Sequence, residues 1–83
     1  MKKINVNEQV SVTAVGFKKN LNVYPRKMEF RGETYDFIDT GLRCLLRCGE
    51  HIAEFFTSTD GISNYHLRLD HSDNGWTLMS ISS

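Results

Sequence analysis

The segment GLRCLLRCGEHIAEFF, residues 41–56, decides the fold because two different periodicities fit it. In a helix, most of its apolar side chains would lie on one stripe, and Thr40 is a suitable N-cap. In a strand, the apolar residues from Leu42 to Cys48 alternate with two arginines. Gly49 would cost about 0.8–1 kcal/mol relative to alanine inside a helix, whereas a turn between strands needs such a residue. We therefore predict two strands, 34–47 and 51–58, joined through 48–50, and keep a helix over 41–56 as the alternative.

The same segment holds Cys44, Cys48 and His51, whose residue types bind metals or carry thiol chemistry. On a strand, the two cysteines would lie about 13 Å apart, too far to share one ion or to form a disulfide with each other. On a helix, they would be about 6 Å apart. The strand interpretation predicts small buried hydrophobic residues on the core face. A metal or thiol-redox role for the three residues depends on the helix and is the second alternative function.

The flanking sequence is also typical of strands. Residues 8–17 are rich in Val and Thr and alternate in polarity. Alternating runs surround Gly32-Glu33 within 25–38, and a second pair surrounds the turn-forming HSDNG of 71–75, so two hairpins are predicted. Together these segments predict an all-β fold, a small antiparallel meander of five to six strands that is barrel-like or a sandwich. The helix alternative would make it α+β.

The alternation also predicts which side chains fill the core. The predicted core consists of Val10, Val12, Met28, Phe30, Tyr35, Phe37, Leu42, Leu46, Phe56, Leu67, Leu69, Trp76 and Leu78.

Length and charge limit the protein class. The 83 residues predict one domain, 1–83. The net charge is zero, but residues 1–48 hold nine Lys and Arg against five Asp and Glu, while residues 49–83 hold one against five, so the halves differ as +4 and −4. We expect no signal peptide, no membrane span and, with two cysteines, no disulfide framework. A cytoplasmic protein with reduced thiols is therefore predicted.

Two short motifs resemble those of a known group of proteins. Phe30, Arg31, Gly32 and Tyr35 form an aromatic-Arg-Gly-x-x-Tyr hairpin, and Trp76 and Leu78 form a Trp-x-Leu pattern in the last strand. Over residues 8–82 the chain resembles a loose family of small uncharacterised bacterial all-β proteins with these two features. The resemblance implies an all-β fold and no particular activity, because the family has none assigned.

Function is predicted from the absence of a recognisable catalytic pattern in so small a chain. The first hypothesis is a non-enzymatic binding or interaction module of unknown partner, with no cofactor, no metal ligands and no membrane contact. The alternative is weak binding of single-stranded nucleic acid by a basic strand face, since β-sheets bind it through cations and stacking aromatic rings. The residues predicted for that face are Lys27, Arg31, Tyr35, Arg43 and Arg47.

Overall fold

Residues 41–56 form a β-hairpin, so the helix alternative is wrong. Strand β4 (Asp39–Cys48) pairs antiparallel with β5 (His51–Thr59), and Cys48 lies opposite His51 across a two-residue turn. Gly49 opens this turn with φ of 62°, in the left-handed region that glycine adopts without steric cost. The predicted use of Gly49 as a turn residue is confirmed.

The computed structural model describes residues 2–17 and 23–83, and the side chain of Leu42 is not among those described. Within these ranges the regular structure consists of seven strands, which are β1 (Lys3–Phe17), β2 (Val23–Phe30), β3 (Glu33–Asp36), β4, β5, β6 (Asn64–Asp70) and β7 (Gly75–Ser82). All pairings are antiparallel, in the order β3-β2-β1-β7-β6-β5-β4. The predicted all-β, barrel-like meander is confirmed.

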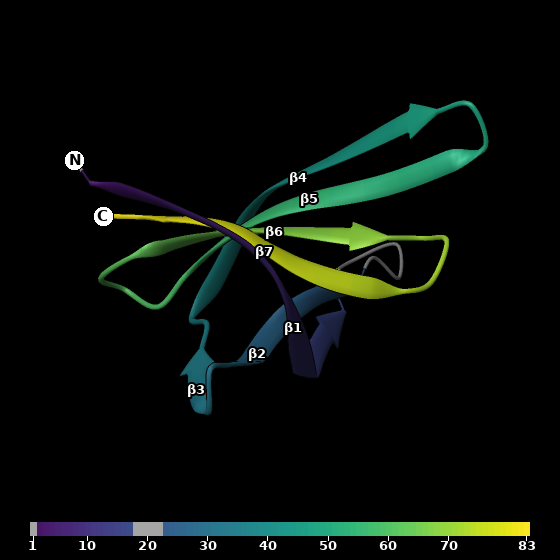
Figure 1. Ribbon diagram of the computed structural model, residues 1–83. Helices are drawn as coiled ribbons and strands as arrows, with labels where there is room; N and C mark the ends of the chain where they lie inside the picture. The colour runs from purple at the N-terminus through teal and green to yellow at the C-terminus, as the bar shows by residue number, and fades with distance from the viewer. Residues whose placement is uncertain (1, 18–22) are drawn as a thin grey trace.

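The sheet curls into a half-barrel because two segments change pairing partner along their length (Figure 1). The first half of β1 pairs with β7, and its second half, from Ser11 onward, pairs with β2. Between β3 and β4, the Phe37 N–H donates to the Arg26 carbonyl and the Ile38 N–H to the Thr59 carbonyl, both at 2.8 Å. Strands that pass from one part of a sheet to another in this way form its corners.

The change of pairing partner between β3 and β4 explains why the structure has seven strands and the prediction had at most six. The strand predicted over 34–47 is interrupted at Phe37 and Ile38, and its two parts are β3 and β4. Counting them as one bent strand gives six, the upper prediction. The turn of the β2–β3 hairpin is Arg31-Gly32, one residue earlier than predicted, with both residues at positive φ (52° and 78°) as a type I′ turn requires.

The core fills the concave side of the half-barrel. Six predicted core residues are buried, and Tyr65, which was not predicted, is buried with them; the cluster is Met28, Phe30, Phe37, Phe56, Tyr65, Leu67 and Leu78. Four further predicted residues, Val10, Tyr35, Leu69 and Trp76, are partly buried and pack against this cluster. Val12 is partly buried but is not part of it. The Leu42 prediction concerns a side chain outside the described set.

A β-bulge in β4 overturns the predicted orientation of the strand. Thr40 lies opposite Ser58 and Arg43 lies opposite Phe56, so β4 contains one extra residue between the two pairs. Because Ser58 and Phe56 lie on the same face of β5, Thr40 and Arg43 both face inward despite their odd spacing. From Arg43 to Cys48, the odd-numbered residues of β4 therefore face inward and the even-numbered residues face outward.

The prediction that Leu46 belongs to the core is therefore wrong, since this side chain is 56% exposed. Cys44 and Cys48 are likewise exposed rather than buried in the core. After the bulge these three residues share the outer face of β4, and Arg43 takes the inward position.

Candidate functional site

The four predicted cations lie apart, and three of them are paired with carboxylates. Lys27 of β2 pairs with Asp36 of β3, with 3.4 Å between Nζ and Oδ1. Arg31 pairs with Glu8 of β1, and Arg43 pairs with Glu54 of β5. Arg47 has no salt bridge within the described part of the chain.

Tyr35, the predicted stacking residue, is held within the protein. Its ring lies between those of Phe30 and Tyr65, with centroid distances of 6.4 and 5.6 Å. Its hydroxyl donates to Glu33 at 3.1 Å, and burial together with this hydrogen bond raises the pKa of Tyr35 above 10.0. The five residues predicted for nucleic-acid binding therefore do not share one set of contacts in the structure.

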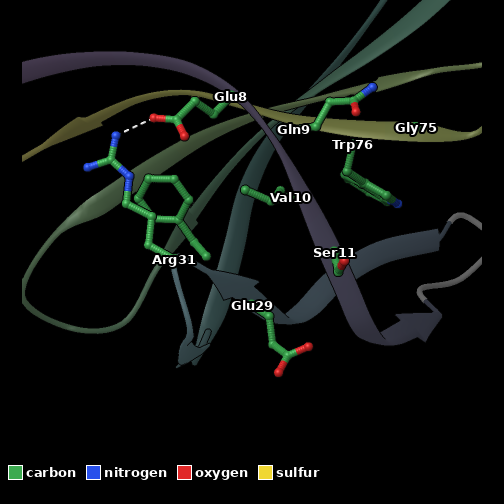
Figure 2. Close-up of a pocket in the computed structure, with 9 residues that line it drawn as sticks. Glu8, Gln9, Val10, Ser11, Glu29, Arg31, Gly75 and Trp76 are labelled. Carbon is green, nitrogen blue, oxygen red and sulfur yellow. Dashed lines mark hydrogen bonds and ion pairs between the residues drawn. The ribbon is translucent and has the colours of Figure 1, made fainter.

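Arg31 borders a groove of about 490 Å³ where β1 passes from β7 to β2 (Figure 2). Its guanidinium reaches the Glu8 carboxylate and also lies 4.9 Å from the centre of the Phe30 ring. The two charged side chains are 69% and 44% exposed. Pairs this open to water contribute little to stability, so the Arg31–Glu8 pair is not a rigidly held polar group of the kind that fixes a ligand.

A second hollow, of about 420 Å³, lies on the concave side, and we call it the cleft. One wall comes from β1 and β2 and the other from β4, β5 and the β6–β7 turn; the lining residues are Val15, Val23, Arg43, Glu54, Leu69, His71, Asn74 and Trp76. Glu54, Leu69 and Trp76 lie opposite one another in successive strands. The cleft therefore has a floor made by one row of the sheet.

Three charged or polar side chains meet at one wall of the cleft. The Glu54 side chain is only 10% exposed, and Arg43 donates to its Oε1. His71 lies with Nε2 2.7 Å from Glu54 Oε2, and its backbone N–H donates to the Ile52 carbonyl at 3.0 Å. A buried carboxylate is stable only when it is hydrogen-bonded, and here both oxygens have a partner.

The floor beside this cluster is apolar. The Trp76 ring packs on Phe56 with centroids 5.4 Å apart, and Leu69 adjoins it in the neighbouring strand. Pockets that combine an apolar surface with a few convergent polar groups are the usual binding sites for small molecules. The cleft is therefore the best candidate site in the described structure.

Arg43 was predicted to lie on a basic face that binds nucleic acid, but it lines the cleft beside Glu54. Glu54 itself was not predicted as a site residue. A signal for Glu54 was present, because it stands between Ile52 and Phe56 at alternate positions that face the core. A carboxylate in such a row requires partners from other strands. His71 lies in the predicted HSDNG turn, and its contact with Glu54 of β5 joins residues 17 positions apart, which a local pattern does not reveal.

The cysteine and histidine segment forms no compact cluster. Cys48 lies opposite His51, while Cys44 is four residues away along the same strand. Among the described residues, no group of three or more His, Cys, Asp or Glu side chains is arranged to hold a metal ion.

Within the described ranges, the structure contains no helix long and apolar enough to cross a membrane. Comparison of the chain with protein-family models, curated proteins and solved structures finds no match in any of the three. Function is therefore inferred from the cleft and from its chemistry.

Proposed function

We propose that the protein is a non-enzymatic binding module, acting in the cytoplasm, whose cleft takes a small amphipathic anion. The ligand class has an apolar body and one carboxylate or sulfonate group. The observation that carries this proposal is the Arg43–Glu54–His71 cluster placed beside the apolar floor of Leu69 and Trp76.

The hydrogen-bonding capacity of the cluster favours an acceptor on the ligand. Arginine has five N–H donors in a planar fork, and Arg43 uses its Nε and one terminal nitrogen on Glu54. The other N–H groups remain for a ligand, and the Arg43 side chain is 35% exposed. Because Glu54 already accepts on both oxygens, a ligand carboxylate or sulfonate complements the wall better than a cation does.

The arrangement supports binding rather than catalysis. Glu54 is held between two donors, so its main effect is to fix the position of Arg43. A positioned guanidinium loses less freedom when a ligand binds, and such preorganisation strengthens binding. The nucleic-acid alternative has weaker support, because Arg31, Lys27 and Arg43 line three different hollows and do not form one continuous basic face.

The test uses Trp76, the single tryptophan of the chain, as an optical reporter. Anilinonaphthalene sulfonate, an aromatic anion, is titrated into the protein while energy transfer from Trp76 is recorded. We expect saturable binding of one probe per chain and displacement of the probe by dodecanoate. Failure of dodecanoate to compete would contradict the proposed ligand class.

Arg43→Gln and Arg47→Gln form a matched pair for this test, since both remove an arginine from the same strand. A hydrogen bond to a charged group contributes about 1.5–3 kcal/mol, so Arg43→Gln should weaken probe binding by about tenfold or more. Arg47→Gln should leave it unchanged, because Arg47 does not line the cleft. Equal effects of the two substitutions would overturn the proposal.

A further inference from the structure

Strand β4 lies at one end of the strand order, so one of its edges has no neighbouring strand among the described residues. Near its start this edge is close to β2, where the Thr40 hydroxyl donates to the Pro25 carbonyl at 3.2 Å. The far part of the β4–β5 hairpin extends away from β2, and its tip stands apart from β6 and β7 (Figure 1). Within the described part of the chain, residues 43–48 of β4 therefore have no strand on this side, and we call them the free edge.

The turn determines which backbone groups this edge presents. Cys48 and His51 flank a two-residue turn, in which the first carbonyl accepts from the last N–H. Hydrogen-bonded and non-hydrogen-bonded pairs then alternate along an antiparallel ladder. The backbone groups of Cys44, Leu46 and Cys48 consequently point toward β5, while those of Arg43, Leu45 and Arg47 point toward the free edge.

We propose that a second copy of this chain pairs with this edge, antiparallel to it and centred on Leu46. Opposite residues in a ladder share a face, so in a two-fold symmetric pair the central residue must face its own copy. Centring on Leu46 places Arg47 opposite Leu45 of the second copy. Leu45 and Leu46, which are 47% and 56% exposed, would be partly covered.

The other registers are less favourable. Centring on Arg43 or Arg47 places that arginine opposite the same arginine of the second copy. Centring on Leu45 places Arg43 opposite Arg47 of the second copy. Like charges directly opposite each other destabilise a sheet. Centring on Cys44 brings the second copy up to Thr40, where β2 adjoins the edge. Centring on Cys48 pairs only residues next to the turn, because the chain reverses after Cys48. The Leu46 register is therefore the one that fits both the charges and the length of the free edge.

This register gives the two cysteines a shared role. It places Cys44 opposite Cys48 of the second copy, and Cys48 opposite Cys44, on the outer face where both thiols are exposed. Both pairs occupy non-hydrogen-bonded positions, at which the Cα atoms lie about 4.5 Å apart. Disulfides require Cα separations of about 4.4–6.8 Å, so each pair is suitably placed to form one.

Pairing of two strand edges covers a small area, so the reduced dimer is weak, and oxidation makes it covalent. A disulfide oxidant such as oxidised glutathione supplies the chemistry. Each new Cys44–Cys48 bond converts two protein thiols to one disulfide, and one oxidised glutathione is reduced to two glutathione thiols. This inference is independent of the cleft, which lies on the concave side of the sheet.

The test oxidises the folded protein with oxidised glutathione and measures covalent dimer on a non-reducing gel, with the linked residues identified by peptide mass spectrometry. We expect dimer joined only through Cys44–Cys48 bonds. Cys44→Ser and Cys48→Ser should each lose the dimer completely, because every bond needs one cysteine of each kind. Mixing the two variants should restore it through the one remaining pair.

Random collision of exposed thiols would give a different pattern, since each single variant would still form dimer through identical cysteines. That result, or no dimer from the unmodified protein, would overturn the proposal. Leu46→Lys should also lower the dimer yield at least tenfold, because two ammonium groups would face each other. Ile62→Lys, at an apolar position that is 86% exposed elsewhere, is the matched control and should leave the yield unchanged. Equal losses in these two variants would equally contradict the assigned register.

Discussion

Replacing Thr40 by valine removes a buried side-chain hydrogen bond between β4 and β2. The Thr40 hydroxyl lies 3.2 Å from the Pro25 carbonyl and 2.9 Å from the Ser58 hydroxyl, and both hydroxyl-bearing residues are buried. Because the carbonyl can only accept, Thr40 donates to Pro25 and accepts from Ser58. Valine has nearly the same shape and breaks both hydrogen bonds.

The size of the effect follows from these two bonds. Each contributes about 0.5–1.5 kcal/mol, so Thr40→Val should lower the free energy of unfolding by about 1–3 kcal/mol. Ser58→Ala breaks one bond and should cost about 1 kcal/mol. The double variant should cost less than the sum by about 1 kcal/mol, because both substitutions remove the same Thr40–Ser58 bond.

Urea unfolding followed by Trp76 fluorescence measures these differences, and an unchanged slope shows that the folded state is intact. Thr34→Val is the control, since Thr34 is exposed on β3 and its replacement should change stability by less than about 0.5 kcal/mol. Additive costs for Thr40 and Ser58, or a Thr40→Val cost no larger than that of the control, would refute the role assigned to this contact.

Three further predictions concern stability. Gly16→Ala should destabilise the fold by about 1–3 kcal/mol in the same urea assay, because the added methyl group would overlap the ring of Tyr24 on the neighbouring strand; full stability would contradict that packing. Hydrogen bonds from the Ser63 and Ile62 N–H groups hold the pKa of Asp60 below 3.8, so its stabilising contribution is present above about pH 4 and is lost as the pH falls through the lowered pKa. Asp60→Asn should therefore flatten the acid side of the stability curve, and an unchanged curve would argue against this role of the Asp60 carboxylate. Burial and the hydrogen bond to Asp60 raise the pKa of Tyr65 from 10.0 to about 12, so its contribution is complete below pH 10 and is lost as the pH rises through 12; absorbance titration should show a phenolate that forms near pH 12 and is missing in Tyr65→Phe, and the absence of any phenolate forming that late would contradict the burial.

The hairpins were predictable because their turns are determined locally. Gly49 and the Arg31-Gly32 pair adopt backbone conformations that mark a reversal of the chain, and alternating residues flank them. The partner change at Phe37 and Ile38 was not predictable, since it depends on hydrogen bonds to Arg26 and Thr59 from other strands. Local pattern thus identified the strands, and long-range contacts determined where they bend.

The candidate site could not be predicted because one inserted residue in β4 changes which side chains face inward. Alternation alone places Cys44 inward and Arg43 outward, and the bulge after Thr40 reverses both. Such an insertion is detected only by pairing β4 with β5, which the sequence of β4 does not reveal. The partners of Glu54 were equally hidden, because Arg43 and His71 reach it from two different elements.

The most direct test of the binding cleft is a nitrogen-edited NMR titration of the protein with dodecanoate. The side-chain N–H signals of Arg43 and Trp76 report from the wall and the floor of the cleft. We predict that both signals shift together with one dissociation constant, while the Arg47 signal stays fixed. Shifts confined to Arg47, or none at Arg43 and Trp76, would contradict the central claim that the concave side of this half-barrel binds amphipathic anions.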